Sequence, residues 1–420
     1  MNKWKPAKLG DIAEMCLGKM LDKEKNKGVL QPYIANVNLR WGGFDLTNLS
    51  TMRFEESESE RYGLKSGDLV VCEGGEPGRC AIWRGEIPEM KIQKAIHRVR
   101  TNKNYSNEFL FYRFLLAGRN GELKKHFIGS TIKHLTGSSL KQVEFDFPSL
   151  TEQNRIAAVL TALDAKIELN QRINAELEGM AKLLYDYWFV QFDFPMTSAQ
   201  AAALGKPNLT GHPYRASGGK MIYNETLKRD IPEGWTDGSL LDVATFTNGI
   251  ACQKYPADGG ETLRVIKIKD MRTGLTAESD IVTANVPSKV KIKNGDILFS
   301  WSASLEVMIW AGGEGALNQH IFKVTSDTHP RSFCYFVLLD YLRHFRMMAD
   351  LRKTTMGHIT IDHLEQSQIA IPDDAVAEAF EVLTKPIINR MVKAHEENQE
   401  LTQLRDWLLP MLMNGQVTVG

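Results

Sequence analysis

The chain has 420 residues, 43% of them hydrophobic, and its 51 Lys and Arg residues balance 51 Asp and Glu residues. This length favours two or more domains, and the composition is that of an ordinary globular protein. The five cysteines show no CxxC spacing, which argues against a zinc site or a secreted disulfide framework and favours a reducing, cytoplasmic location. No apolar run approaches the roughly 18 residues of a membrane span, so we expect no membrane partner.

The balanced net charge conceals an uneven distribution. Residues 1–150 carry 24 basic and 18 acidic residues, a net charge of +6, whereas residues 231–372 carry 14 and 16, a net charge of −2. The stretch 91–141 has 11 Lys and Arg residues against two acidic residues. Such a local excess suits the binding of phosphates, and it is also typical of a solvated basic face.

Two halves of the chain repeat one another. The segment WKPAKLGDIAEMCLGK, which starts at Trp4, aligns with WTDGSLLDVATFTNGI, which starts at Trp235. Further on, SGDLVVCEGG aligns with NGDILFSWSA, and IKHLTGSS aligns with IDHLEQSQ, an alignment that pairs His134 with His363. NAELEGMAKLL (174–184) returns as NQELTQLRDWLL (398–409). The constant order of these landmarks indicates an internal duplication, with loop insertions that make the offset drift.

In chain order, we predict a domain at 1–150, a helix at 151–192, a connector at 193–230, a second domain at 231–372 and a C-terminal helix at 373–420. Short alternating apolar segments such as DLVVCEGG and DILFSWSAS predict strands in both domains. NEFLFYRFLLAG and SFCYFVLLDYL predict helices between them. The expected fold class is therefore α+β, with two mixed α/β domains.

The helix at 151–192 follows Pro148, and Thr151 is its expected N-cap. Its apolar residues recur mostly at alternating spacings of four and three, which is the pattern of a coiled-coil seam. Asn170 falls in this seam, where it either fixes the register or faces solvent. In the second copy, Pro386 should kink the helix or delay its start.

Neither helix can bury such a seam alone. We therefore expect the two helices to pack against each other as an antiparallel coiled coil, with the halves of the chain related by a pseudo-twofold axis. The alternative is that each helix packs only on its own domain.

The sequence lacks the motifs of an enzyme. A Gly-Lys pair occurs in SGGKM, but Tyr214 stands where the first glycine of a P-loop would be. The glycine-rich segments EGGEPGRC and AGGEGAL predict tight turns, and no Asn/Asp-Pro-Pro-aromatic element for adenine methyl transfer is present. We predict a binding protein without catalytic residues or a metal site. The alternatives are a single-chain DNA methyltransferase or nuclease with an unrecognised centre, and a coiled-coil scaffold unrelated to DNA.

Two loop regions combine flexible glycines, hydroxyl groups and basic residues, namely GRNGELKKHFIGSTIKHLTGSS in the first half and LRKTTMGHITIDH in the second. These side chains suit contacts with phosphates and base edges, and nearby amides suit adenine. Taken singly, each residue is also compatible with an ordinary surface loop. The candidate DNA-binding residues are Arg79, Gln93, Lys94, Lys124, Lys125, Ser130, Thr131, Lys133 and His134 in the first half, and Ser302, Ser304, Gln319, His320, Arg352, Lys353, Thr354, Thr355 and His358 in the second.

Three segments resemble one known family. They are FPSLTEQNRIAAVLTALDAKIELNQRINAELEGMAKLLYDYWFVQFDF (147–194), the connector segment ASGGKM (216–221) and the ending LRDWLLPMLMNGQ (404–416). The chain resembles the specificity (S) subunit of a type I restriction-modification system over nearly its whole length. The resemblance implies two target recognition domains that each read one half of a bipartite sequence in double-stranded DNA. It also implies an antiparallel coiled coil between them.

The resemblance further implies that two modification (M) subunits dock on the repeated helices and that restriction (R) subunits join this core. The chain itself would need no cofactor. The modification subunits would bind S-adenosylmethionine, and the restriction subunits would bind ATP and Mg. The residues expected to contact partner subunits are Leu177, Met180, Leu184, Tyr187, Trp188, Phe189, Leu401, Leu404, Trp407 and Leu408.

Overall fold

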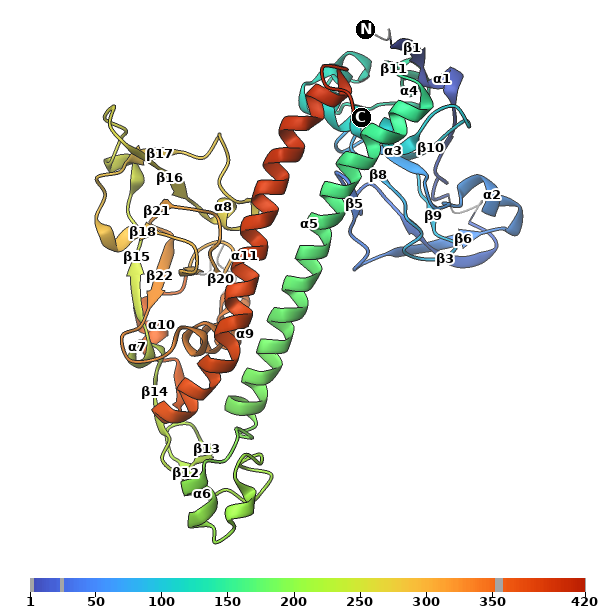
Figure 1. The fold of residues 1–420 in the computed structure, drawn as a ribbon. Coiled ribbons are helices and arrows are strands. Elements are labelled where there is room, and N and C mark those ends of the chain that lie inside the picture. Colours follow the sequence, from blue (N-terminus) through green and yellow to red (C-terminus); the bar gives the residue numbers. More distant parts are fainter. Residues whose placement is uncertain (1–3, 23–25, 352–357, 420) are drawn as a thin grey trace. The chain divides into compact units, whose positions relative to one another are not determined.

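The chain forms two compact units in a computed structural model that describes residues 4–22, 26–351 and 358–419. The first unit contains Met1–Lys166 and Leu401–Gly420, and the second contains Ile167–Glu400. Each unit combines one mixed α/β domain with segments of two long helices, α5 and α11 (Figure 1).

The domain of the first unit is built on a four-stranded antiparallel sheet in the order β2-β10-β7-β8. All four residues of β7, LVVC, are buried, because helix α3 and further strands cover the sheet. Ser106 begins α3 by accepting a hydrogen bond from the Phe109 amide at 3.3 Å. The strands are β1 (Lys5–Lys8), β2 (Ala13–Leu17), β3 (Val29–Ile34), β4 (Leu39–Arg40), β5 (Gly43–Phe44), β6 (Ser50–Phe54), β7 (Leu69–Cys72), β8 (Cys80–Ile82), β9 (Lys91–Ile92), β10 (Ile96–Thr101) and β11 (Glu144–Phe147). The helices are α1 (Leu9–Ile12), η1 (Glu56–Glu58), α2 (Ser59–Tyr62), α3 (Asn107–Arg119), η2 (Glu122–His126) and α4 (Gly137–Gln142).

The domain of the second unit repeats this topology. Its four-stranded sheet has the order β15-β22-β19-β20, and β14 pairs with β23 as β1 pairs with β11. A parallel pair, β16 with β21, corresponds to β3 with β9. The strands are β14 (Thr236–Ser239), β15 (Thr245–Asn248), β16 (Thr262–Ile266), β17 (Ile281–Thr283), β18 (Lys291–Ile292), β19 (Ile297–Ser300), β20 (Glu306–Ile309), β21 (Gly315–Leu317), β22 (Ile321–Thr325) and β23 (Gln368–Ile371). The helices are α7 (Leu240–Val243), η5 (Cys252–Lys254), α8 (Ile268–Thr273), η6 (Ser288–Val290), α9 (Arg331–Leu351) and α10 (Ile361–Glu365).

The duplication extends to single backbone hydrogen bonds. The Gly18 amide donates to the Ile96 carbonyl at 3.0 Å, and the Gly249 amide donates to the Ile321 carbonyl at the same distance. A Cβ atom on Gly18 would lie 2.3 Å from the carbonyl oxygen of Gln93, and the corresponding approach at Gly249 is 2.2 Å. Both copies therefore need glycine at this crossing.

The structure corrects one pairing in the sequence alignment. Thr136 directly precedes α4 and Thr360 directly precedes α10, which are equivalent helices. His134 therefore corresponds to His358, and the predicted pairing of His134 with His363 is wrong. The offset of 224 residues between Thr136 and Thr360 also relates strand β11 to strand β23, so the two copies have equal lengths over this segment.

The first long helix is α5 (Leu150–Tyr185), which continues as a π-helical turn, η3 (Asp186–Val190). The predicted cap at Thr151 is wrong, because the Ser149 hydroxyl accepts a hydrogen bond from the Glu152 amide at 3.3 Å. Thr151 already lies inside the helix, so it cannot serve as the cap.

The second long helix is α11 (Asp374–Met413), which continues past Pro386 without a break. The predicted delay of its start is therefore wrong. Asp373 begins the helix by accepting a hydrogen bond from the Val376 amide at 2.9 Å.

The two long helices pair in antiparallel fashion within each unit. In the first unit, Asp164 of α5 accepts a hydrogen bond from Arg405 of α11 at 2.8 Å. In the second unit, the Asn170 amide donates to Asn398 at 3.0 Å, and the Asn174 amide donates to the Met391 carbonyl at 3.2 Å. Residue numbers rise along α5 as they fall along α11, which is the antiparallel arrangement.

Asn170 lies in the helix seam and is fully buried. Its amide also donates to the Glu397 carboxylate at 2.7 Å. Of the two interpretations that the sequence left open, the one in which this residue faces solvent is therefore excluded. A buried amide that needs a polar partner on the opposite helix favours one register of pairing over its neighbours.

The segment predicted as a connector packs into the second unit. It contains α6 (Ser198–Ala203), η4 (Pro207–Leu209), β12 (Met221–Asn224) and β13 (Arg229–Pro232). Phe194 stacks on Tyr214 with ring centroids 4.7 Å apart, and on Trp235 with centroids 5.3 Å apart. These rings belong to the core of the second unit, so the segment is a folded part of that unit.

Within the described ranges, no helix is both long enough and apolar enough to cross a membrane.

Candidate nucleic-acid interface

Loops gather at one edge of the four-stranded sheet in the first unit. Strands β2 and β7 end at this edge and β10 and β8 begin there, because neighbouring strands of the sheet are antiparallel. The Lys94 amide donates to the Lys19 carbonyl at 2.8 Å, and the Leu135 amide donates to the Glu73 carbonyl at 2.7 Å. We call residues 17–20, 73–79, 93–95 and 129–136 the first loop edge.

The first loop edge contains many of the residues that the sequence identified. Gln93 pairs with Lys19 in a parallel bridge, and Lys94 is exposed beside it. The His134 ring lies against Gly74, where an added Cβ atom would be 3.0 Å from its Nδ1 atom. Ser130, Thr131 and Lys133 are exposed in a loop that is closed by two 2.8 Å backbone hydrogen bonds between residues 128 and 134. Lys124 and Lys125 are exposed on the neighbouring turn η2.

Arg79 holds the turn between β7 and β8. Its guanidinium donates to Glu76 at 2.9 Å and to the Asn36 carbonyl at 2.8 Å, and its side chain is 17% exposed. These contacts leave little of the guanidinium available to a ligand. Arg79 therefore has a structural task in this loop edge.

A buried histidine in β10 contacts the loop that contains His134 and Leu135. His97 of β10 is 1% exposed, and its Nε2 atom lies 3.2 Å from the Leu135 carbonyl oxygen. Burial lowers the pKa of His97, against the opposing effect of the Glu73 charge. The ring is therefore neutral at neutral pH, and it ties β10 to the loop that carries His134.

The second unit presents an equivalent edge, which we call the second loop edge and define as residues 248–251, 301–305, 318–320 and 358–360. The Gln319 amide donates to the Ile250 carbonyl at 2.9 Å, and the Ile359 amide donates to the Trp301 carbonyl at the same distance. These bonds match those of Lys94 and Leu135 in the first unit. The duplicated fold thus places the same loops at the same edge of both sheets.

The predicted residues of the second half are distributed unevenly over this edge. Gln319 and His320 lie together, with Nε2 atoms 3.3 Å apart, and His358 is exposed. Ser302 is 5% exposed, and the Ser304 carbonyl accepts a hydrogen bond from the Ser300 hydroxyl. The other four predicted residues, Arg352, Lys353, Thr354 and Thr355, lie outside the described residues.

Sequence reasoning missed Trp301, which lies at the centre of the second loop edge. Its ring centroid lies 5.5 Å from that of His320 and 5.4 Å from that of His358. The indole nitrogen donates to the Asn248 side chain at 3.1 Å. The segment SWSASLE contains this residue, whose ring also packs on the core of the second unit, with its centroid 6.0 Å from that of Phe322.

Two rows of exposed apolar side chains occupy equivalent faces of the long helices. On α5 in the second unit, Met180 is 60% exposed and Leu183 is 69% exposed, and Tyr187 in the following turn η3 is 38% exposed. At the repeated positions on α11 in the first unit, Leu404 is 43% exposed and Trp407 is 58% exposed. We call these the α5 row and the α11 row. Leu183 was not among the residues expected to contact partners.

The remaining residues expected to contact partners lie deeper. Trp188 is 3% exposed and Phe189 is 6% exposed, and both belong to the core of the second unit. Their side chains offer no surface to a partner, so their expected role is corrected. Leu177, Leu184, Leu401 and Leu408 are partly buried.

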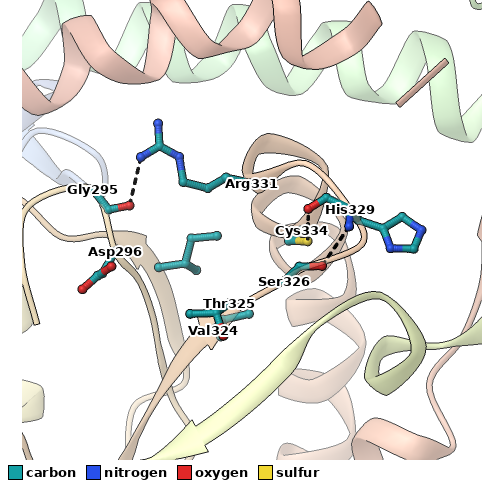
Figure 2. Close-up of a pocket in the computed structure, with 9 residues that line it drawn as sticks. Gly295, Asp296, Val324, Thr325, Ser326, His329, Arg331 and Cys334 are labelled. Carbon is teal, nitrogen blue, oxygen red and sulfur yellow. Dashed lines mark hydrogen bonds between the residues drawn. The ribbon is translucent and has the colours of Figure 1, made fainter. Parts of the chain in front are cut away.

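A pocket of about 190 Å³ lies at the other end of the second sheet, where β19 begins and β22 ends (Figure 2). The Arg331 guanidinium donates to the Gly295 carbonyl at 3.2 Å beside it. Thr325 lines this pocket, and its counterpart in the first unit is Arg100. Arg100 forms a bidentate ion pair with Asp68. The second copy has the smaller Thr325 at this place, and the pocket is separate from the loop edge.

Among the described residues, no three or more His, Cys, Asp or Glu side chains are grouped so that they could hold a metal ion.

Comparisons with a family model and with relatives point to the same protein family, and comparison with a solved structure supports the fold. A family model described as the type I restriction modification DNA specificity domain matches residues 1–179 and 232–401. The MjaIX specificity subunit of a type I restriction enzyme from Methanocaldococcus jannaschii is 27% identical over 329 residues, which cover 74% of this chain and 69% of that protein. The HindI specificity subunit from Haemophilus influenzae is 25% identical over an alignment that covers 99% of this chain and 100% of that protein. The crystal structure of a type I restriction-modification S subunit from M. genitalium has a TM-score of 0.56 at 14% identity, covers 97% of this chain and 96% of that one, and supports the fold.

Proposed function

Because the chain belongs to the type I restriction-modification DNA specificity family, we propose that it selects the DNA sequence on which a type I restriction-modification complex acts. The family model matches the two halves separately, at residues 1–179 and 232–401. Each half carries its own loop edge on its own four-stranded sheet. Two readers of this kind suit a bipartite target in double-stranded DNA, with one half-site for each domain.

The observation that carries this proposal is the conserved backbone of the two loop edges combined with their divergent side chains. The same hydrogen bonds hold both edges, yet Lys94 is replaced by Gln319 and Glu73 by Trp301. Two domains that recognise different base sequences need the same backbone with different side chains, because base edges are distinguished by their donor, acceptor and methyl patterns. We assign residues 1–150 and 231–372 as the two target recognition domains.

The α5 row and the α11 row support a docking role for the repeated helices, which we assign to residues 151–192 and 373–420. Equivalent exposed apolar residues, such as Leu183 and Trp407, give two copies of one surface. Two copies of one surface suit two identical partners, which we infer to be the modification subunits. The restriction subunits would join through that core.

This assignment places catalysis on other chains. The specificity subunit would contribute no cofactor, whereas S-adenosylmethionine would be bound by the modification subunits, and ATP with Mg by the restriction subunits. The family membership disfavours the alternative of a single-chain methyltransferase or nuclease. Such an enzyme would act as a purified chain, and the specificity subunit would not.

The decisive experiment is to produce the chain together with the modification subunit encoded beside its gene and to sequence the host DNA for N6-methyladenine. A bipartite methylated motif that appears only when this chain is present is the expected result. A matched control lacks this chain and retains the modification subunit. Methylation that is independent of the chain, or methyl transfer by the chain alone, would overturn the proposal.

A further inference from the structure

The two loop edges differ in chemistry at one equivalent position, occupied by Glu73 in the first unit and Trp301 in the second. The carbonyl of each residue accepts a hydrogen bond from the loop that follows a histidine, from Leu135 in one case and from Ile359 in the other. Those histidines, His134 and His358, are also equivalent. The negatively charged Glu73 and the aromatic Trp301 therefore occupy equivalent positions on the same backbone arrangement of loops.

The Glu73 carboxylate is available as an acceptor. Glu73 is partly buried, and within the part of the chain that the structure describes no hydrogen bond reaches its carboxylate. The neighbouring His97 ring is neutral because burial lowers its pKa, so it does not compensate the charge. A half-buried carboxylate without a donor gains from a ligand that supplies one.

Trp301 offers the opposite chemistry. Its only polar atom, the indole nitrogen, already donates to Asn248 at 3.1 Å. His320 and His358 contact the ring and hold it in place. The part of the ring that remains accessible is apolar, so it suits a methyl group better than a hydrogen-bonding edge.

We propose that the residue at this position sets the base preference at one position of each half-site. Glu73 accepts a hydrogen bond from the exocyclic amino group of a base, with cytosine as the preferred base, and Trp301 contacts the 5-methyl group of thymine. Both groups are displayed in the major groove of double-stranded DNA. This inference rests on the proposed function, and it names the groups that the two domains read.

The test uses the full chain in complex with its modification subunits. Duplexes that carry single base substitutions in each half-site compete for the wild-type complex and for complexes with Glu73→Gln, Trp301→Leu or Trp301→Phe. Glu73→Gln should reduce discrimination at one position of one half-site by roughly 5- to 150-fold, the range of a single good base contact. Trp301→Leu should do so in the other half-site only, and Trp301→Phe should retain most of the preference. Lys133→Ala is a matched control at an exposed residue of the same loop edge, and it should weaken all duplexes alike.

A second measurement needs no mutation. Replacement of one thymine by deoxyuridine removes only the 5-methyl group. At the position read by Trp301, this change should weaken binding of the wild-type complex, and it should weaken binding of the Trp301→Leu complex less, because leucine presents less apolar surface to the methyl group. This measurement keeps the inference testable even if a variant folds poorly.

The outcomes separate the inference from the proposed function. Equal weakening of every duplex by Glu73→Gln and Trp301→Leu, or no deoxyuridine effect at any thymine of the target, would overturn the inference while the bipartite motif remains. Absence of any bipartite motif with the wild-type complex would overturn the proposed function itself.

Discussion

Asp164 joins three elements of the first unit, and its removal should loosen that unit selectively. The carboxylate accepts a hydrogen bond from the Tyr112 hydroxyl of α3 at 2.7 Å and another from Arg405 of α11 at 2.8 Å. Burial and the Asp164 charge raise the pKa of Tyr112, so the phenol remains a protonated donor. We expect Asp164→Ala to weaken the attachment of α3 to both long helices.

The magnitude follows from the two contacts. A hydrogen bond to a charged acceptor contributes about 1.5–3 kcal/mol, and the buried Tyr112 hydroxyl would retain only the longer contact with the Thr161 hydroxyl at 3.4 Å. The Arg405 and Asp164 side chains are 19% and 32% exposed, so after discounting for solvent screening their ion pair adds at most about 1 kcal/mol. Asp164→Ala should therefore lower the free energy of unfolding of the first unit by about 2–4 kcal/mol.

The assay combines urea denaturation with hydrogen exchange. Asp164→Ala should lower the urea midpoint without a change in slope, and it should speed exchange in α3 and residues 401–413 while α9 keeps its protection. Tyr112→Phe should add little further loss in the Asp164→Ala background, because the two residues share one interaction. Glu168→Ala, an exposed position on the same helix, is the control. An unchanged midpoint for Asp164→Ala, or equal loss of protection in α9, would refute the reasoning.

Three further predictions follow from individual contacts. Gly249→Ala would place a Cβ atom 2.2 Å from the Asn318 carbonyl oxygen and should lower the free energy of unfolding by about 1–3 kcal/mol. The control is Gly179→Ala, where a Cβ atom meets nothing within 4 Å, and it should be neutral or stabilising. Equal shifts in melting temperature for the two variants would contradict the close approach at Gly249. Because burial lowers the pKa of His97 below its value in the unfolded chain, the unfolded state binds more protons, so the contribution of this group is fully present above about pH 6.5 and declines as the pH falls below that value. The stability difference between wild type and His97→Gln should therefore change between pH 5 and 7, and a difference that is independent of pH would argue against a neutral buried ring. Leu183→Glu and Trp407→Glu should each remove one bound modification subunit, and the double variant should remove both. Each substitution should change the free energy of unfolding by no more than about 0.5 kcal/mol. Sedimentation of each variant mixed with modification subunits measures the stoichiometry, and two subunits bound to the double variant would show that the α5 row and the α11 row are not the docking sites.

Much of the architecture was predictable because it is repeated. Two copies of one sequence pattern identify landmarks that a single copy would not, such as Gly18 and Gly249, whose matched spacing reflects a backbone crossing too tight for any side chain. The α+β class and the paired long helices were also predictable, since strand alternation and the seam spacing report directly on which side chains must be buried.

Predictions from the sequence were wrong where the preference of a single residue was outweighed by packing in the folded chain. Pro386 is a strong helix breaker by propensity, yet α11 continues past it, because packing of the helix outweighs the loss of one backbone hydrogen bond. Trp188 and Phe189 look like exposed docking residues on a helix, but η3 turns them into the core of the second unit.

The sequence by itself determined that this protein is a duplication with two strand-rich domains, two paired helices and no recognisable catalytic motif. Only the tertiary structure decided which residues share a surface. The loop edges combine residues as far apart in the sequence as Lys19 and His134, and the equivalence of His134 with His358 is set by backbone hydrogen bonds that the sequence does not record. Side-chain spacing reports on burial along one element, whereas a binding surface depends on which strand ends a sheet brings to one edge.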